Sequence, residues 1–262
     1  ALVRHGFSFS GEIDGSVQVL LPESTTLNGG AGISNDLLIS GLPEVKVYGN
    51  ATYVAVIEAD GAATPTNHRV TLNDRTVVRY VVRQVDAIEL PTVDAPAAPT
   101  GTRDVSVNQS GQAIGDPATL RNLTINRNGG DVTVPPGAYG DFISNGGAFV
   151  LGVAGSTEPA MYDLRSLTLN SNAQLKVVGP VILTVRQSVS FNSAKADGHD
   201  AAALTLRVHA GDVTLNGSTT LNGTVIAPSG QVSLNGSSVI RGSVAADRLT
   251  LNKQAVLKEP DL

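Results

Sequence analysis

The densest group of chemically capable side chains lies in the stretch from 194 to 203, which contains Lys195, Asp197, His199 and Asp200. Carboxylate oxygens and an imidazole can hold a divalent cation or serve as acid and base. We therefore place a candidate metal site at Asp197, His199 and Asp200, and calcium is the only cofactor that it suggests. The alternative is an ordinary polar loop tip around Gly198.

The other acidic residues bear on polysaccharide cleavage. A hydrolase needs two carboxylates that flank the scissile bond, and a lyase needs calcium-binding acids beside an Arg or Lys base. The candidate acids are Asp116, Asp131, Asp141, Glu158 and Asp163. No two of them occupy adjacent copies of the repeat described below. We therefore assign no catalytic residue and expect a protein that is not an enzyme, with a polysaccharide lyase or hydrolase as an alternative.

Aromatic side chains are the usual platforms for sugar rings, and this chain has few of them. Aromatic residues make up 4% of the sequence and Trp is absent, which argues against strong binding to crystalline glycans. Two pairs lie close together in the sequence, so we predict a ligand-binding set that consists of Tyr48, Tyr53, Tyr139, Phe142 and Tyr162. The alternative for each residue is a place in the core or at a corner.

Composition excludes several classes of protein. The net charge is −5 and no basic cluster is present, which argues against nucleic acid as a partner. There is no Cys, so disulfides and a thiolate zinc site are excluded, and the composition suits an exported protein. No apolar run approaches the ~18 residues of a membrane span.

A short phrase recurs along the chain: an apolar residue, Thr or Ser, an apolar residue, then Asn. Copies in the second half follow one another at about 17 to 24 residues, and they contain alternation rather than a helical period. The copies are VTLN at 70–73, VSVN at 105–108, LTIN at 123–126, LTLN at 167–170, VSFN at 189–192, VTLN at 213–216, VSLN at 232–235 and LTLN at 249–252.

This repeat predicts an all-β, single-stranded parallel β-helix, with right-handed winding preferred. Side chains alternate between the two faces of a strand, so stacking the copies about 4.8 Å apart aligns their apolar residues into an interior column. Thr214, Ser233 and Thr250 then form a polar column outside. Each Asn lies where the chain turns, and stacked Asn side chains can pair with one another.

We expect one β-helix domain over 1–262. Residues 1–11 are the expected cap of an exposed solenoid end. The Pro-rich stretch 91–103 is expected to be a loop that crosses the surface, since Pro cannot donate to a strand ladder; a domain boundary is the alternative. Residues 104–258 hold the most regular coils, with a corner insertion near 194–203.

Several phrases resemble known β-helix proteins. VPPGAY at 134–139 resembles a V-P-x-G-x-Y phrase of secreted, pectate-lyase-like parallel β-helices, many of which act on polysaccharides. GTVIAP at 223–228 and GSVAAD at 242–247 are similar to bactofilins, which are short β-helices that polymerise end to end. The Asn-Gly corners resemble those of surface and pilus-associated bacterial β-helices. The bactofilin resemblance covers under a quarter of the chain, which departs from that family in its long insertions and Asn corners.

These observations lead to a functional expectation. We expect a non-catalytic module, secreted or at the surface of a bacterial cell, that binds extended polysaccharide or cell-surface glycan. A structural or adhesive spacer that associates with itself, end to end or side by side, is the first alternative. Ice binding is a weaker one, because only one rank of Thr and Ser is evident.

Overall fold

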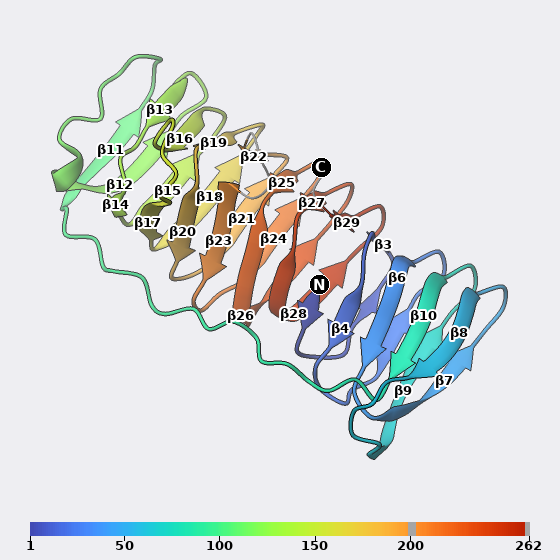
Figure 1. The fold of residues 1–262 in the computed structure, drawn as a ribbon. Coiled ribbons are helices and arrows are strands. Elements are labelled where there is room, and N and C mark those ends of the chain that lie inside the picture. Colours follow the sequence, from blue (N-terminus) through green and yellow to red (C-terminus); the bar gives the residue numbers. More distant parts are fainter. Residues whose placement is uncertain (199–202, 260–262) are drawn as a thin grey trace.

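The computed structural model describes residues 1–198 and 203–259, and in it the chain forms a parallel β-solenoid of about 10 turns (Figure 1). Within the described residues the one helix is the single-turn 3-10 element η1 (Pro117–Thr119). Burial alternates along the strands as the repeat predicts: Val213 and Leu215 are buried, whereas Thr214 between them is not. The predicted all-β parallel solenoid is confirmed.

Each turn places strands on three faces, which we call A, B and C. Face A carries the recurring Asn phrase. Its strands, in spatial order, are β11 (Arg103–Val107), β12 (Leu120–Ile125), β15 (Asp141–Ser144), β18 (Ser166–Asn170), β21 (Val189–Asn192), β24 (Val213–Asn216), the second halves of β26 (Thr224–Leu234) and β28 (Val244–Leu251), then β2 (Ser8–Phe9), β5 (Thr25–Leu27), β9 (Pro65–Leu72) and β7 (Leu42–Val47).

Face B continues each turn after the corner. Its strands are β13 (Asp131–Thr133), β16 (Ala148–Gly152), β19 (Gln174–Val178), β22 (Lys195–Gly198), β25 (Thr220–Asn222), β27 (Val239–Arg241), β29 (Val256–Lys258), β3 (Glu12–Ile13) and the first parts of β6 (Gly32–Ile39), β10 (Val77–Arg83) and β8 (Thr52–Glu58).

Face C closes each turn. Its strands are β14 (Gly137–Ala138), β17 (Ala160–Leu164), β20 (Val181–Val185), β23 (Leu204–Val208), the first halves of β26 and β28, then β1 (Leu2–Val3), β4 (Val17–Val19) and the second parts of β6, β10 and β8.

The spatial order of the coils differs from their order in the sequence. The rod begins at β11, and the N-terminal coils stack on the C-terminal ones, because β1 pairs with β28 and β3 pairs with β29 (Figure 1). We call this junction the seam. The Arg4 guanidinium and the Asp247 carboxylate form an ion pair across it at 2.9 Å.

The expectation that residues 1–11 cap an end of the solenoid is therefore wrong. β1 lies between β28 and β4, inside the stack. Phe9 is fully buried in the interior column, and the Ser10 amide donates to the Leu251 carbonyl at 3.0 Å. Buried and exposed side chains alternate along the segment as they do in the other coils. Its strand β1 pairs with a strand on each side, so the segment is an internal part of the rod.

The last three coils are also interleaved. β9 lies between β5 and β7, and β10 lies between β6 and β8. The chain thus builds the outermost coil, made of β7 and β8, before it inserts the coil made of β9 and β10 beneath it. The outermost coil is one end of the rod.

Residues 84–102, which we call the strap, connect β10 to β11 at the opposite end of the rod (Figure 1). The strap contains the predicted Pro-rich stretch and runs along face C. Four hydrogen bonds attach it there: Gln18 Nε2 to the Asp86 carbonyl (2.8 Å), His209 Nδ1 to the Val93 carbonyl (2.8 Å), Arg186 Nη2 to the Pro96 carbonyl (2.9 Å) and the Ala97 amide to Asp163 Oδ2 (3.1 Å).

The predicted corner insertion near 194–203 is partly regular structure. Residues 195–198 form β22 on face B, in register with Gln174–Val177 of β19. β23 begins at Leu204 on face C, so the insertion is shorter than its sequence suggests. Within the described residues no helix is long and apolar enough to cross a membrane.

Candidate ligand-binding face

The Asn residues of face A form a directional ladder at the corner. In each step the side-chain nitrogen of one Asn donates to the side-chain oxygen of the Asn one coil earlier. The distances are 2.6 Å from Asn126 to Asn108, 3.4 Å from Asn145 to Asn126, 3.1 Å from Asn170 to Asn145, 2.8 Å from Asn192 to Asn170, 2.8 Å from Asn216 to Asn192, 2.9 Å from Asn235 to Asn216 and 2.8 Å from Asn252 to Asn235. The predicted pairing of stacked Asn side chains is confirmed.

The ladder ends at the seam. Ser10 takes the position that follows Asn252, and its hydroxyl accepts a hydrogen bond from the Lys253 amide at 3.1 Å. Asn28 and Asn73 resume the series in the next two coils, and Tyr48 takes the position in the outermost coil, where its amide donates to the Leu72 carbonyl at 2.8 Å.

Beside the ladder runs a row of small hydroxyl side chains, which we call the hydroxyl row. Its members point outward from face A, two residues before each corner, and they lie in register from coil to coil. The row consists of Ser106, Thr124, Ile143, Thr168, Ser190, Thr214, Ser233, Thr250, Ser8, Thr26, Thr71 and Lys46. Only Ile143 and Lys46 interrupt the hydroxyl chemistry, so the row extends along the whole rod.

Arg–carboxylate pairs flank this row near β11. Arg121 binds Asp104 through two nitrogens, at 2.9 and 2.7 Å, and Arg165 binds Asp141 in the same way, with its Nε at 2.7 Å. The guanidinium in each pair lowers the pKa of the carboxyl group. These charges neutralise one another, so the row from Ser106 to Thr250 is a neutral surface, and all its side chains except Ile143 can donate and accept hydrogen bonds.

The predicted aromatic platforms are mostly internal, and this corrects the predicted ligand-binding set. Tyr139, Phe142 and Tyr162 are buried in the core and cannot contact an external ligand. Phe142 lies 5.2 Å from Tyr139 between ring centroids, and burial raises the pKa of Tyr139 to about 12. Tyr48 and Tyr53 are 53% and 38% exposed, but they belong to the outermost coil rather than to a continuous face.

The burial of Phe142 and Tyr162 can be predicted from the alternation of inward and outward residues along their strands. Phe142, Ile143 and Ser144 precede Asn145 as an apolar-x-x-Asn variant of the repeat, so Phe142 occupies an inward position. Tyr162 likewise alternates with the outward Met161 and Asp163 in β17. The Tyr162 hydroxyl donates to the Val134 carbonyl and accepts from the Gly152 amide, both at 2.8 Å.

The candidate metal site stays a prediction. His199 and Asp200 lie outside the described residues, and of Asp197 only the backbone is described, paired with Lys176. Among the described residues, no three His, Asp or Glu side chains gather as metal ligands would.

Four of the five candidate acids, all except Glu158, have side-chain partners within the described residues. Asp116 accepts from the Ala118 amide at the start of η1, Asp131 pairs with Lys176 at 2.6 Å, and Asp163 accepts from the strap. None of these contacts provides the pair of free carboxylates that flanks a bond in a glycoside hydrolase.

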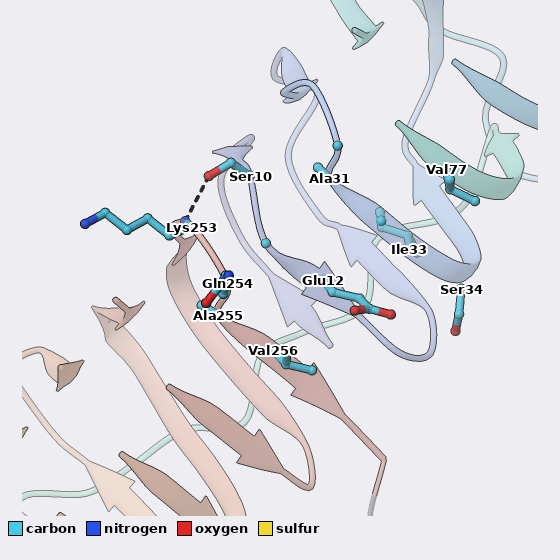
Figure 2. Close-up of a pocket in the computed structure, with 13 residues that line it drawn as sticks. Ser10, Glu12, Ala31, Ile33, Ser34, Val77, Lys253, Gln254, Ala255 and Val256 are labelled. Carbon is cyan, nitrogen blue, oxygen red and sulfur yellow. Dashed lines mark hydrogen bonds between the residues drawn. The ribbon is translucent and has the colours of Figure 1, made fainter. Parts of the chain in front are cut away.

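A groove of about 590 Å³ lies at the seam on face B (Figure 2). Gly11, Gly30 and Gly32 line it and contribute no side chain, which leaves this space open. Glu12 and Lys253 are its charged residues. A second hollow of about 440 Å³ lies at the strap, where Pro91 meets apolar residues of face C such as Leu38 and Ile226.

The fold and this face define a parallel β-solenoid with a neutral, repetitive polar surface. No protein-family model, no curated protein and no solved structure matches the chain.

Proposed function

We propose that this protein is a non-catalytic module that binds an extended polysaccharide or cell-surface glycan along face A. The observation that carries the proposal is the hydroxyl row, which runs the length of the rod beside the Asn ladder. The module belongs outside the cell in this proposal, where such ligands occur.

The chemistry of the row suits a sugar polymer. A Ser or Thr hydroxyl both donates and accepts, as a sugar hydroxyl does, so the two can pair in either direction. The row repeats at the strand spacing of about 4.8 Å, close to the length of one unit in an extended glycan. A repetitive ligand can therefore meet an equivalent group at each coil.

The burial of three predicted aromatic platforms determines the kind of binding that we expect. Without stacking rings, each coil contributes only hydrogen bonds, which are worth about 1 kcal/mol each. Affinity then arises from many weak contacts along one chain, so it should increase steeply with ligand length. Short oligosaccharides should bind poorly.

The test is affinity electrophoresis through gels that contain soluble xylans, glucans or pectins. The variant is the triple change Thr168→Val, Ser190→Ala and Thr214→Val, which removes three consecutive hydroxyls of the row. Three lost hydrogen bonds should weaken binding by about a hundredfold.

The matched control removes three hydroxyls in register on face C, by Thr205→Val, Thr224→Val and Ser243→Ala. It should be retained like the unchanged protein. Lack of retention of the unchanged protein in every gel, or equal loss in both triple variants, would reject the proposal.

A structural or adhesive surface spacer is the second candidate, and it resembles the role of other bacterial surface β-helices. The uncapped end of the rod, described below, supports it. The lyase alternative has less support, because Asp104, Asp131 and Asp141 are each paired with Arg or Lys. Release of an unsaturated sugar product in the presence of calcium would support the lyase alternative.

A further inference from the structure

The outermost coil is an open end of the solenoid. β7 pairs only with β9 and β8 pairs only with β10, so the outer backbone groups of both strands have no strand partner within the described residues. A long edge strand with unpaired amides and carbonyls is a template for pairing with another chain.

Apolar side chains gather at this end. Val47 and Tyr53 are in register with the buried Leu72 and Val78, so they belong to the interior column, yet they are 39% and 38% exposed. Tyr48, Val54 and Ile57 of the same coil are also exposed. The interior of the rod therefore reaches the surface here.

The opposite end is closed. There the edge strand is β11, and its inward residue Val107 is completely buried. A loop folds back and is held by Arg103, whose guanidinium donates to the Ile114 carbonyl at 2.7 Å, the Asp116 carbonyl at 3.0 Å and the Thr119 hydroxyl at 3.1 Å. The contrast between Val107 and Val47 shows that only one end lacks a cover.

We propose that two copies of this chain associate through their open ends, with β7 and β8 of each copy pairing antiparallel with the same strands of the other. A two-fold axis through the middle of β7 generates this contact. The surface is self-complementary, as an isologous interface requires, and the closed ends point outward. Association therefore stops at a dimer.

Charge complementarity supports a second copy as the occupant. Glu44 and Lys46 flank Val45 in β7, and the Lys46 ammonium lies 3.6 Å from the Glu44 carboxylate. An axis at Val45 places Glu44 of each copy opposite Lys46 of the other. Opposite charges then face each other at the centre of β7, and two apolar interiors join into one.

The first experiment measures the molar mass by light scattering over a range of concentrations. The expected mass is twice the 26.9 kDa of the chain, with no larger species. Val47→Asp should weaken association by at least a hundredfold, because it buries a charge in the contact. Val178→Asp is the matched control, since Val178 is 36% exposed and lies far along the rod, and it should stay dimeric.

A charge exchange tests the pairing without changing the core. Lys46→Glu should weaken the dimer by about tenfold or more, and adding Glu44→Lys should restore it. Circular dichroism and the thermal midpoint verify that each variant is folded.

The orientation is tested by cysteine cross-linking, because the natural chain has no Cys. Val45→Cys should give a disulfide-linked dimer, because residues opposite each other across antiparallel strands have Cα separations compatible with a disulfide. Val178→Cys should not. A monomer at all concentrations, filaments, a dimeric Val47→Asp variant, or failure of Val45→Cys to cross-link would each overturn the proposal.

Discussion

The Asn side chains of face A illustrate why one residue type recurs at the corner. An amide carries both a donor and an acceptor, so each Asn can donate to the coil before it and accept from the coil after it. Asp would lack the donor and Leu would lack both. Asn192 shows the arrangement, with partners Asn170 and Asn216 both at 2.8 Å.

Asn192→Ala should therefore destabilise the protein by about 1–3 kcal/mol, because it leaves two neighbouring amides without a partner. Urea unfolding measures the change. Asn128→Ala is the control, since Asn128 is exposed and lies outside the ladder, and its effect should be within about 0.5 kcal/mol. Equal stability of the two variants would show that the ladder contributes nothing.

The buried Tyr162 hydroxyl joins two turns of backbone. Tyr162→Phe should cost about 1–3 kcal/mol, because the Val134 carbonyl and the Gly152 amide lose their shared partner in the core. Tyr48→Phe removes an exposed hydroxyl and should leave the free energy of unfolding unchanged. An unchanged unfolding curve for Tyr162→Phe would mean that water replaces the hydroxyl.

At the scale of elements, the inserted coil of β9 and β10 contains an unusual buried group. His68 of β9 is 6% exposed, and neither of its ring nitrogens makes a hydrogen bond. Burial lowers the pKa of His68, and the nearby Ser40 backbone opposes this shift only in part. Burial in this coil therefore disfavours the charged form of the imidazole relative to the neutral form.

This burial predicts a pH dependence of stability. Above pH ~6.5 the His68 ring is neutral in both the folded and the unfolded chain. As the pH falls below that value, the unfolded chain binds the proton first, so the free energy of unfolding decreases. The thermal midpoint should fall between pH 7 and pH 5, and His68→Leu should reduce that fall. Parallel pH profiles for the two proteins would contradict the prediction.

At the scale of the whole molecule, the seam makes the two ends of the sequence neighbours in the middle of the rod. The pairing of β1 with β28 and of β3 with β29 continues the same ladders that join every other coil. The strap spans the rod to make this possible, because it connects the coils of residues 1–83 to those of residues 103–259. We expect the ladders at the seam, rather than the strap, to hold these two parts together.

A cut in the strap should therefore leave the molecule intact. A protease site placed between Ile88 and Glu89, both exposed, divides the chain into two fragments. We expect them to co-elute in size-exclusion chromatography and to separate only in denaturant. Adding Val3→Asp, which buries a charge at the seam, should let the cut fragments separate. Separation of the fragments without that change would show that the strap is essential.

The sequence by itself determined the strands, the corners and the interior column. Alternation in phrases such as VTLN at 213–216 has one structural solution, because a period of two places Val213 and Leu215 on the same side. The Asn positions followed in the same way. The sequence predicted the hydroxyl row at Thr214, Ser233 and Thr250, and the other copies of the phrase carry Thr or Ser at the same position. The structure added the members that lie outside these copies, namely Ile143, Ser8, Thr26 and Lys46.

Only the tertiary structure decided which coil stacks on which. All coils offer similar backbone ladders, so any coil can stack on any other, and their order depends on side-chain fit along the whole column. That is why β1 joins β28 and why β9 enters beneath β7. A repeating sequence defines the unit of a solenoid, whereas its neighbours and open end are set by packing between distant segments.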